Sequence, residues 1–228
     1  MSRRPSIAID GPVAAGKSTI ARTVAARLGY TYVDTGAMYR ALAWAARERN
    51  IGPQDAARVV ALLDQTQIRL SPRPGGGNEV LVDGRRVTAD IRGQDIGQLA
   101  SQLSEIPAVR RRMVALQREM AKDGGVVMEG RDIQTVVLPD AEVKVFLTAS
   151  VEERARRRHV ELQQRGFESD YESVLREIQE RDHRDSTRAD SPLRAAPDAV
   201  QLDTTGLTQE EVISRVLEIV AQRTAARG

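Results

Sequence analysis

The stretch Gly11–Ser18, with the sequence GPVAAGKS, constrains the fold of this chain more than any other feature. It follows a short buried-strand pattern at Ser6–Asp10 and opens the segment Ser18–Leu28, whose apolar residues recur at helical spacing before Gly29. A strand, a turn with the pattern G-x-x-x-x-G-K-[ST] and a helix together indicate a phosphate-binding loop. In such a loop the glycines allow backbone N–H groups to face a phosphate, and the helix N-terminus adds positive potential.

The loop predicts binding of a nucleoside triphosphate together with Mg²⁺. The ammonium of Lys17 would contact the β and γ oxygens, and the Ser18 hydroxyl would coordinate the metal ion. The alternative, a plain glycine turn before a helix, requires all four fixed positions of the pattern to match by chance. The residues expected to bind ATP are Gly11, Pro12, Val13, Ala14, Ala15, Gly16, Lys17, Ser18 and Thr19.

Strand and helix patterns alternate along the rest of the chain, with one β-rich interruption from Gln67 to Val87. This order predicts an α/β fold: a parallel sheet of the P-loop NTPase type with helices on both faces, a small β-rich insertion in the acceptor-binding region, and a helical lid. We expect one domain, 1–228, with a core at 1–35, 107–150 and 196–228, an acceptor-binding region at about 36–106 and a lid at about 151–190.

Local signals give finer expectations for the turns and helix ends. Pro53 is expected to open a helix that runs to about Gln65. A loop is expected at Pro72–Asn78, and Asp83-Gly84 between β-prone runs predicts a hairpin turn. Capping boxes are expected at Ser150–Glu153 and Thr208–Glu211, because each pairs a hydroxyl residue with a glutamate three positions later.

Composition excludes several classes of function. The absence of cysteine rules out disulfides, thiolate nucleophiles and cysteine-ligated metals, and it fits a reducing compartment. A net charge of +2 is too small for a protein that coats nucleic acid, and no apolar run approaches the roughly 18 residues of a membrane span. We therefore expect a cytoplasmic monomer whose partners are small molecules, with no nucleic acid and no membrane among them.

The phosphate-binding loop leaves the acceptor of the phosphoryl group open. A guanine-nucleotide switch should carry an N-K-x-D tetrapeptide, and no Asn-Lys pair occurs in this chain. A motor ATPase should be larger and carry sensor elements. Small kinases instead combine the loop with an arginine-lined acceptor pocket and a mobile, arginine-rich lid. Lysine occurs only at Lys17, Lys122 and Lys144, so nearly all positive charges are arginines. Genome bias explains most of this excess, and only the positions of the arginines can therefore indicate an acceptor pocket.

Four clusters of polar residues have the character of an acceptor pocket. Each alone could be a solvated or salt-bridged surface. Together with the loop they predict a pocket at the carboxyl ends of the strands, where α/β sheets open onto a crevice. The clusters are Asp34–Arg40, Ser101 with Arg110, Glu129–Asp132, and the helical face of Arg181, Asp185 and Arg188.

With these clusters, the sequence resembles the bacterial cytidylate kinase family. The resemblance rests on IDGPVAAGKS near the N-terminus, DTGAMYR from Asp34, ASQ from Ala100, EGRDIQTVVLPDA from Glu129 and ERDHRDSTR from Glu180, and it covers nearly the whole chain. It implies a nucleoside-monophosphate-kinase fold and transfer of the γ-phosphoryl group of MgATP to CMP or dCMP. Another small P-loop kinase with a different acceptor, or a nucleotide-binding module without one, are the alternatives.

The resemblance also assigns residues to the acceptor. It implies that Thr35, Arg40, Arg131 and Arg188 hold the phosphate, that Ser101, Arg110 and Asp132 read cytosine, and that Arg181 and Asp185 lie at the sugar. The base chemistry agrees, because a carboxylate can accept from the N4 amino group of cytosine but faces an acceptor in uracil. Such a mismatch costs about 1 to 3 kcal/mol. Thr35 stands where many relatives have Ser, and Glu129 where some have Asp.

The expected lid begins with Arg154, Arg156, Arg157 and Arg158. Arg154 is expected to be exposed, whereas Arg157 and Arg158 are expected to clamp ATP and to stabilise the charge on the transferring phosphoryl group. No general base is needed, because the acceptor phosphate is already nucleophilic. The residues expected to act in catalysis are Lys17, Arg131, Arg157, Arg158 and Arg188.

Overall fold

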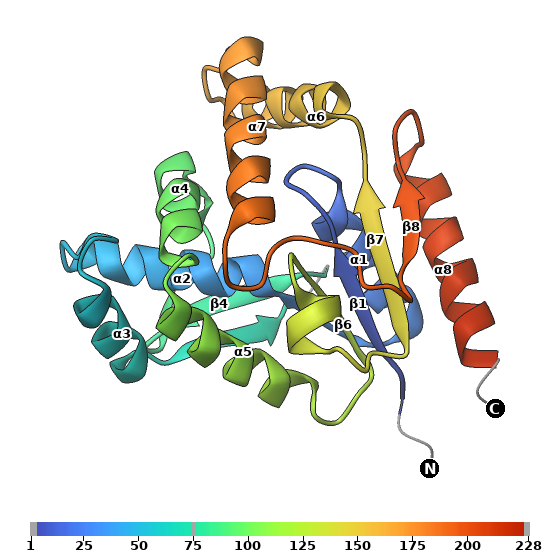
Figure 1. Ribbon diagram of the computed structural model, residues 1–228, viewed down its shortest axis with the longest axis horizontal. Helices are drawn as coiled ribbons and strands as arrows, with labels where there is room; N and C mark the ends of the chain where they lie inside the picture. The colour runs from blue at the N-terminus through green and yellow to red at the C-terminus, as the bar shows by residue number, and fades with distance from the viewer. Residues whose placement is uncertain (1–3, 74–75, 226–228) are drawn as a thin grey trace.

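A five-stranded, all-parallel sheet with helices on both faces forms the centre of the molecule (Figure 1). The structure is a computed structural model that describes residues 4–73 and 76–225; residues 74 and 75 of the expected loop and both ends of the expected domain lie outside this range. The strand order is β2-β6-β1-β7-β8, which confirms the expected parallel α/β fold. The strands are β1 (Ser6–Asp10), β2 (Thr31–Asp34), β6 (Val126–Gly130), β7 (Val143–Thr148) and β8 (Val200–Asp203).

The two faces of the sheet are buried by different helices. Alternate side chains of a strand point to opposite faces, so Ile7 and Ile9 of β1 pack with α1 (Lys17–Leu28) and α8 (Gln209–Ala225). Ala8 packs on the other face with α5 (Pro107–Ala121) and with η2, a single π-helical turn at 133–137. All five residues of β1 are buried, as expected for the central strand of a doubly covered sheet.

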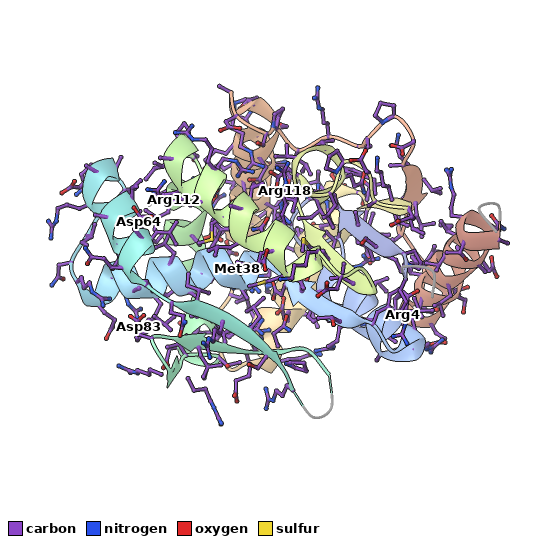
Figure 2. All side chains as sticks on the ribbon, turned by 90° about the horizontal axis from the view of Figure 1, so that it is seen from below. Arg4, Met38, Asp64, Asp83, Arg112 and Arg118 are labelled. Atoms are coloured by element: carbon purple, nitrogen blue, oxygen red, sulfur yellow. The ribbon has the colours of Figure 1, made fainter. Side chains whose placement is uncertain are left out.

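The segment between β2 and β6 forms a lobe beside the sheet with its own apolar core. It contains α2 (Thr35–Glu48), α3 (Ala56–Gln65), the antiparallel sheet β3 (Ile68–Pro72), β4 (Asn78–Val82) and β5 (Arg85–Arg86), the 3₁₀ turn η1 (Asp90–Arg92) and α4 (Gln94–Leu103). Met38 of α2 lies in the interior of the lobe, and Arg112 of α5 forms an ion pair with Asp64 of α3 (Figure 2). This ion pair ties the lobe to α5.

The turns of the lobe confirm one local expectation and correct another. Asp83 and Gly84 both have positive φ, 50° and 81°, as the predicted hairpin turn between β4 and β5 requires. Helix α3 begins at Ala56 and not at Pro53, because the Asp55 side chain accepts a hydrogen bond from the backbone N–H of Arg58 and so caps the helix. Pro53 lies in the turn before this cap.

Two helices, α6 (Val151–Gln164) and α7 (Tyr171–Thr187), stand above the carboxyl ends of the strands (Figure 1). They pack on each other through a small apolar cluster that includes Ala155 of α6 and Ile178 of α7. These helices occupy the region expected to form the lid.

The two expected capping boxes differ in the structure. At the start of α8 the Thr208 hydroxyl accepts from the Glu211 N–H at 3.3 Å and Glu211 accepts from the Thr208 N–H at 2.8 Å, so this box is complete. At the start of α6 the Ser150 hydroxyl accepts from the Glu153 N–H, but the Glu153 carboxylate binds two arginines of its own helix. The backbone N–H of Ser150 donates to Thr205 instead, so only half of the expected box forms.

Candidate active site

The loop between β1 and α1 has the geometry of a phosphate cradle. At Gly11, with φ 154°, a Cβ atom would lie 2.0 Å from the backbone oxygen of Leu147, so only glycine fits. Gly16 has φ 87° and caps α1 with no side chain over the helix N-terminus. The loop therefore brings its backbone against β7 and leaves the first N–H groups of α1 facing the space above the sheet.

Lys17 is buried beneath this loop. Its Nζ donates to the backbone oxygen of Pro12 at 2.6 Å. Burial and the positive charge of Arg131 hold the pKa of Lys17 well below its ordinary value. A bound phosphate would place a negative charge beside Lys17 and so favour its ammonium form, as expected for the lysine of a phosphate-binding loop.

A carboxylate lies beside the Ser18 hydroxyl that was expected to hold Mg²⁺. Glu129, at the end of β6, accepts a hydrogen bond from the Tyr32 hydroxyl at 2.5 Å, and the Ser18 hydroxyl lies close enough to favour its charged form. Burial raises the pKa of Glu129, and the charge of Asp34 adds to this effect. A hydroxyl and a carboxylate side by side are the oxygen donors that Mg²⁺ prefers, so the residues present fit the ion. Sequence reasoning placed Glu129 in the motif but did not predict a carboxylate beside Ser18, which β6 brings next to the phosphate loop by pairing with β1.

The residues expected at the acceptor phosphate lie at the ends of β2 and β6. The Thr35 hydroxyl donates to the backbone oxygen of Glu129 at 2.6 Å, and Arg40 pairs with Asp34 at 2.9 Å. Arg131 pairs with Asp185 at 2.9 Å across to α7. The structure thus brings three of the four expected phosphate ligands, Thr35, Arg40 and Arg131, to the same edge of the sheet.

Helix α7 carries Arg181 and Asp185 as expected, but it ends at Thr187, so Arg188 follows the helix and does not lie on its face. Burial, with the neighbouring charge of Arg131, lowers the pKa of Arg181 to about 10. Burial alone would raise the pKa of Asp185, but Arg131 and Arg181 hold it below its ordinary value. Arg188 donates from Nε to the backbone oxygen of Ser191 at 2.7 Å.

Among the described residues, five guanidinium N–H groups are buried and have no hydrogen-bond partner: Nε of Arg40, Arg110, Arg181 and Arg184, and Nη2 of Arg188. Four of these arginines, Arg40, Arg110, Arg181 and Arg188, are among those expected at the acceptor. Buried donors are nearly always satisfied in folded proteins, so a ligand that supplies the acceptors would fit here. Since the groups belong to cations, the fitting ligand is an anion rich in oxygen, such as a phosphate ester.

The residues expected to read the base form a buried group beside these arginines. Arg110 and Asp132 are paired, with their side chains only 3% and 9% exposed, and Ser101 is also buried. Tyr39 lies beside them, and burial raises its pKa to about 12. Sequence reasoning named Tyr39 only within a motif, although its position one turn from Thr35 on α2 could have placed it in the pocket.

A buried carboxylate connects the phosphate loop to the base-reading segment. Asp10, the last residue of β1, accepts hydrogen bonds from the backbone N–H groups of Ile133 and Gln134 at 3.1 and 2.8 Å. Burial raises the pKa of Asp10 to about 7. The π-helical turn η2 follows Asp132 directly, so Asp10 fixes the backbone that carries Arg131 and Asp132. No sequence signal predicted this contact.

The lid arginines correct one expectation. Arg154 is only 4% exposed, not exposed as expected, because its guanidinium contacts Val13 of the phosphate loop and Asp182 of α7. Arg157 binds Glu153 and both the hydroxyl and the backbone oxygen of Thr204.

The other expected clamp, Arg158, pairs with Glu161 on the same helix. In this conformation the guanidinium groups of Arg157 and Arg158 are therefore engaged by the protein. Their action on ATP stays a prediction.

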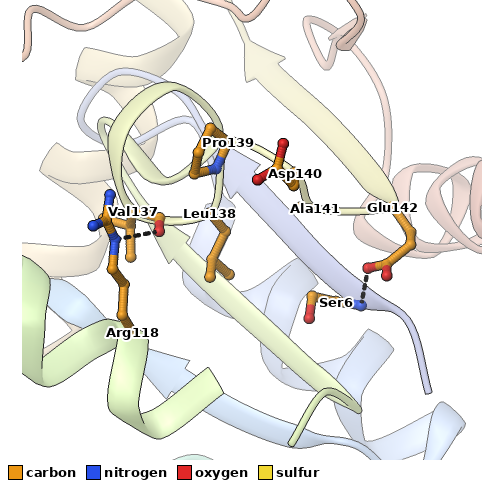
Figure 3. Close-up of a pocket in the computed structure, with 8 residues that line it drawn as sticks. All are labelled: Ser6, Arg118, Val137, Leu138, Pro139, Asp140, Ala141 and Glu142. Carbon is orange, nitrogen blue, oxygen red and sulfur yellow. Dashed lines mark hydrogen bonds between the residues drawn. The ribbon is translucent and has the colours of Figure 1, made fainter. Parts of the chain in front are cut away.

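A hollow of about 350 Å³ lies at the opposite end of the sheet (Figure 3). It is lined by Ser6, the first residue of β1, by Glu142, which directly precedes β7, and by Arg118 and the segment 137–141. Glu142 accepts from the Ser6 N–H at 2.7 Å, and Arg118 donates to the backbone oxygen of Val137. Since the phosphate loop follows the other end of β1, this hollow is separate from the nucleotide site.

The fold and the site define a kinase of the P-loop class, with a phosphate loop and buried arginines at the carboxyl ends of one parallel sheet and two helices beyond them. The family model described as cytidylate kinase matches residues 7–222. The chain belongs to the cytidylate kinase family.

Its relatives in that family match over almost their whole length. It is 56% identical over 223 residues to "Cytidylate kinase" of Geobacillus kaustophilus, covering 98% of this chain and 99% of the relative. It is 50% identical to "Cytidylate kinase" of Carboxydothermus hydrogenoformans, covering 95% and 97%. In fold it resembles an uncharacterized protein from Eubacterium ventriosum at a TM-score of 0.53 and 12% identity, covering 97% and 99% of the two chains.

Proposed function

We propose that this protein transfers the γ-phosphoryl group of ATP to CMP or dCMP, giving CDP or dCDP and ADP. The observation that carries the proposal is the buried Arg110–Asp132 pair, together with buried guanidinium N–H groups of Arg40, Arg110, Arg181 and Arg188 that have no hydrogen-bond partner. The carboxylate suits the N4 amino group of cytosine, and the guanidinium groups suit a monophosphate. The naming of the relatives as cytidylate kinases supports the same substrate.

On the donor side, the loop Gly11–Thr19 binds the triphosphate through its backbone N–H groups and the ammonium of Lys17. Mg²⁺ would be held by the Ser18 hydroxyl, with the Glu129 carboxylate beside it as a further oxygen donor. When bound, the ion neutralises charge on the β and γ phosphoryl oxygens. Arg157 and Arg158 exchange their present partners for ATP when the lid closes.

On the acceptor side, Thr35, Arg40, Arg131 and Arg188 hold the phosphate of CMP. Ser101 and Arg110 serve the N3 and O2 acceptors of cytosine, and Asp132 accepts from the N4 amino group. Arg181 and Asp185 bind the sugar. The two phosphates meet over the end of β1, where Lys17, Arg131 and Arg188 place opposite charge around the transferring group. No side chain has to act as a base, because the acceptor phosphate oxygen is already ionised.

The remaining expectations concern the molecule as a whole. We propose a single kinase domain with the core, acceptor-binding region and lid given above, acting as a cytoplasmic monomer on small nucleotides and not on nucleic acid. In the described residues no helix is both long enough and apolar enough to cross a membrane. The near-balanced charge supports the exclusion of nucleic acid, because binding along a phosphate backbone needs a sustained excess of positive charge.

A coupled assay of ADP release tests the proposal, with CMP, dCMP, UMP, AMP and shikimate as acceptors. We expect the highest kcat/KM with CMP or dCMP. Preference for UMP or AMP would overturn the substrate assignment. ATP hydrolysis that does not respond to any acceptor would overturn the assignment of kinase activity itself.

A further inference from the structure

One buried guanidinium links three parts of the kinase that are distant in sequence. Arg154, near the start of α6, donates from Nε to the backbone oxygen of Ala149 at the end of β7, at 3.0 Å. Its Nη1 donates to the backbone oxygen of Val13 in the phosphate loop at 3.2 Å, and it pairs with Asp182 of α7 at 2.6 Å. The planar fork of arginine can make all three contacts at once, whereas an ammonium is a point charge.

The contact with Val13 bears on the shape of the phosphate loop. Lys17 holds the backbone oxygen of Pro12, and Arg154 holds the next one along the chain. A peptide unit whose oxygen is held by a cation on one side has its N–H turned to the other side, so these contacts orient the loop. Val13 and Ala14 also pack against the apolar cluster between α6 and α7, which is a second, independent link from the loop to the lid.

The contact with Asp182 bears on the acceptor site. Asp182 lies between Arg181 and Asp185 on α7, the two residues that we place at the sugar of CMP. A helix moves as a rigid element over such a short distance, so any shift of α7 that brings Arg181 and Asp185 onto CMP also moves Asp182. Arg154 then transmits that shift to Val13, because its guanidinium holds both groups.

We propose that Arg154 and Asp182 form a latch that couples CMP binding on α7 to the geometry of the ATP loop. Arg154 is a positioning residue: it touches no substrate and acts through the Val13 backbone. The inference rests on the proposed function, since it needs a monophosphate on α7 and a triphosphate on the loop. Each nucleotide then binds to a protein that the other has already ordered, which makes the two bindings mutually favourable.

Calorimetric titration of CMP, with and without a saturating nonhydrolysable ATP analogue, measures this coupling. The readout is the ratio of the two CMP dissociation constants. Because both constants are measured on the same variant, a general loss of stability does not by itself change their ratio. We expect a ratio of about five or more for the wild-type protein. In Asp182→Asn, which keeps the shape of the side chain but removes its charge, we expect the ratio to fall below about two while CMP still binds.

Arg154→Lys provides a second variant, because it keeps the charge but cannot hold all three partners. Its ratio should fall in the same way. The matched control is Glu180→Gln, which removes the same charge from an exposed position on the same helix and should leave the ratio unchanged.

The possible outcomes separate the latch from the proposed function. A wild-type ratio of one, or variants that keep the wild-type ratio, overturns the latch while saturable CMP binding upholds the proposed substrate. A wild-type protein that does not bind CMP with or without the analogue overturns both. A fall in the ratio that the Glu180→Gln control shares is also a result against the latch, because a loss of charge anywhere on α7 would then suffice.

Discussion

Replacing Asp132 by Asn tests how the cleft distinguishes cytosine from uracil. In the structure the carboxylate is paired with Arg110 and both side chains are almost fully buried. An Asn side chain has nearly the same shape but can turn its amide NH₂ toward the O4 of uracil. Removing a good acceptor from the N4 amino group costs about 1 to 3 kcal/mol, so kcat/KM for CMP relative to UMP should fall roughly tenfold to hundredfold.

The same variant should leave the affinity for ATP within about twofold of wild type, because Asp132 contacts no residue of the phosphate loop through its side chain. The assay compares kcat/KM for CMP and UMP by ADP release and the ATP dissociation constant by titration. Asp185→Asn is the matched control: it alters an equally buried carboxylate of the same cleft and should weaken CMP and UMP alike. If Asp132→Asn lowered the affinity for ATP, CMP and UMP by the same factor, the base-reading role would be wrong.

Three further outcomes follow from the donor side. Gly11→Ala forces a Cβ against the backbone oxygen of Leu147, so ATP binding should weaken by about 1 to 3 kcal/mol, which raises the ATP dissociation constant roughly tenfold to hundredfold in a titration. An unchanged constant would show that the loop is not held against β7. Burial and Arg131 lower the pKa of Lys17, and bound phosphate favours its ammonium form, so ATP binding should take up protons and should weaken as pH rises toward about 10.5. Calorimetry in buffers of different ionisation enthalpy measures this uptake, and its absence would contradict the prediction. Glu129→Gln should raise the Mg²⁺ concentration for half-maximal activity without changing the KM for CMP, and an unchanged Mg²⁺ dependence would remove Glu129 from the metal site.

Local signals were sufficient for much of the fold. The strand Ser6–Asp10 has the bounds that its apolar pattern predicted, and the helix predicted at Ser18–Leu28 begins one residue earlier, at Lys17, and ends before Gly29 as expected. The hairpin at Asp83-Gly84 was equally local, since two consecutive positive φ angles demand those residue types. The predicted start of α3 was wrong because proline and aspartate, two residues apart, are both typical of the first positions of a helix.

Contacts between distant segments could not be predicted. The π-helical turn after Asp132 depends on hydrogen bonds to Asp10, which is more than 120 residues away in the sequence. The burial of Arg154 depends on Val13 and Asp182, from two other segments, whereas its own helix is rich in exposed charge. The sequence thus indicated which residue types gather at the cleft, but not which of them pair with one another in the absence of nucleotide.

The buried arginines near the end of the sheet have a consequence for the stability of the protein. Arg181 has a lowered pKa because folding brings it into a buried site beside Arg131, so the empty protein carries a repulsion that unfolding would release. A bound nucleotide phosphate would supply the counter-charge that offsets this repulsion. Nucleotides should therefore protect this kinase against heat and proteolysis beyond what their contacts with the loop alone would give, and its abundance in a cell would follow the supply of its own substrates.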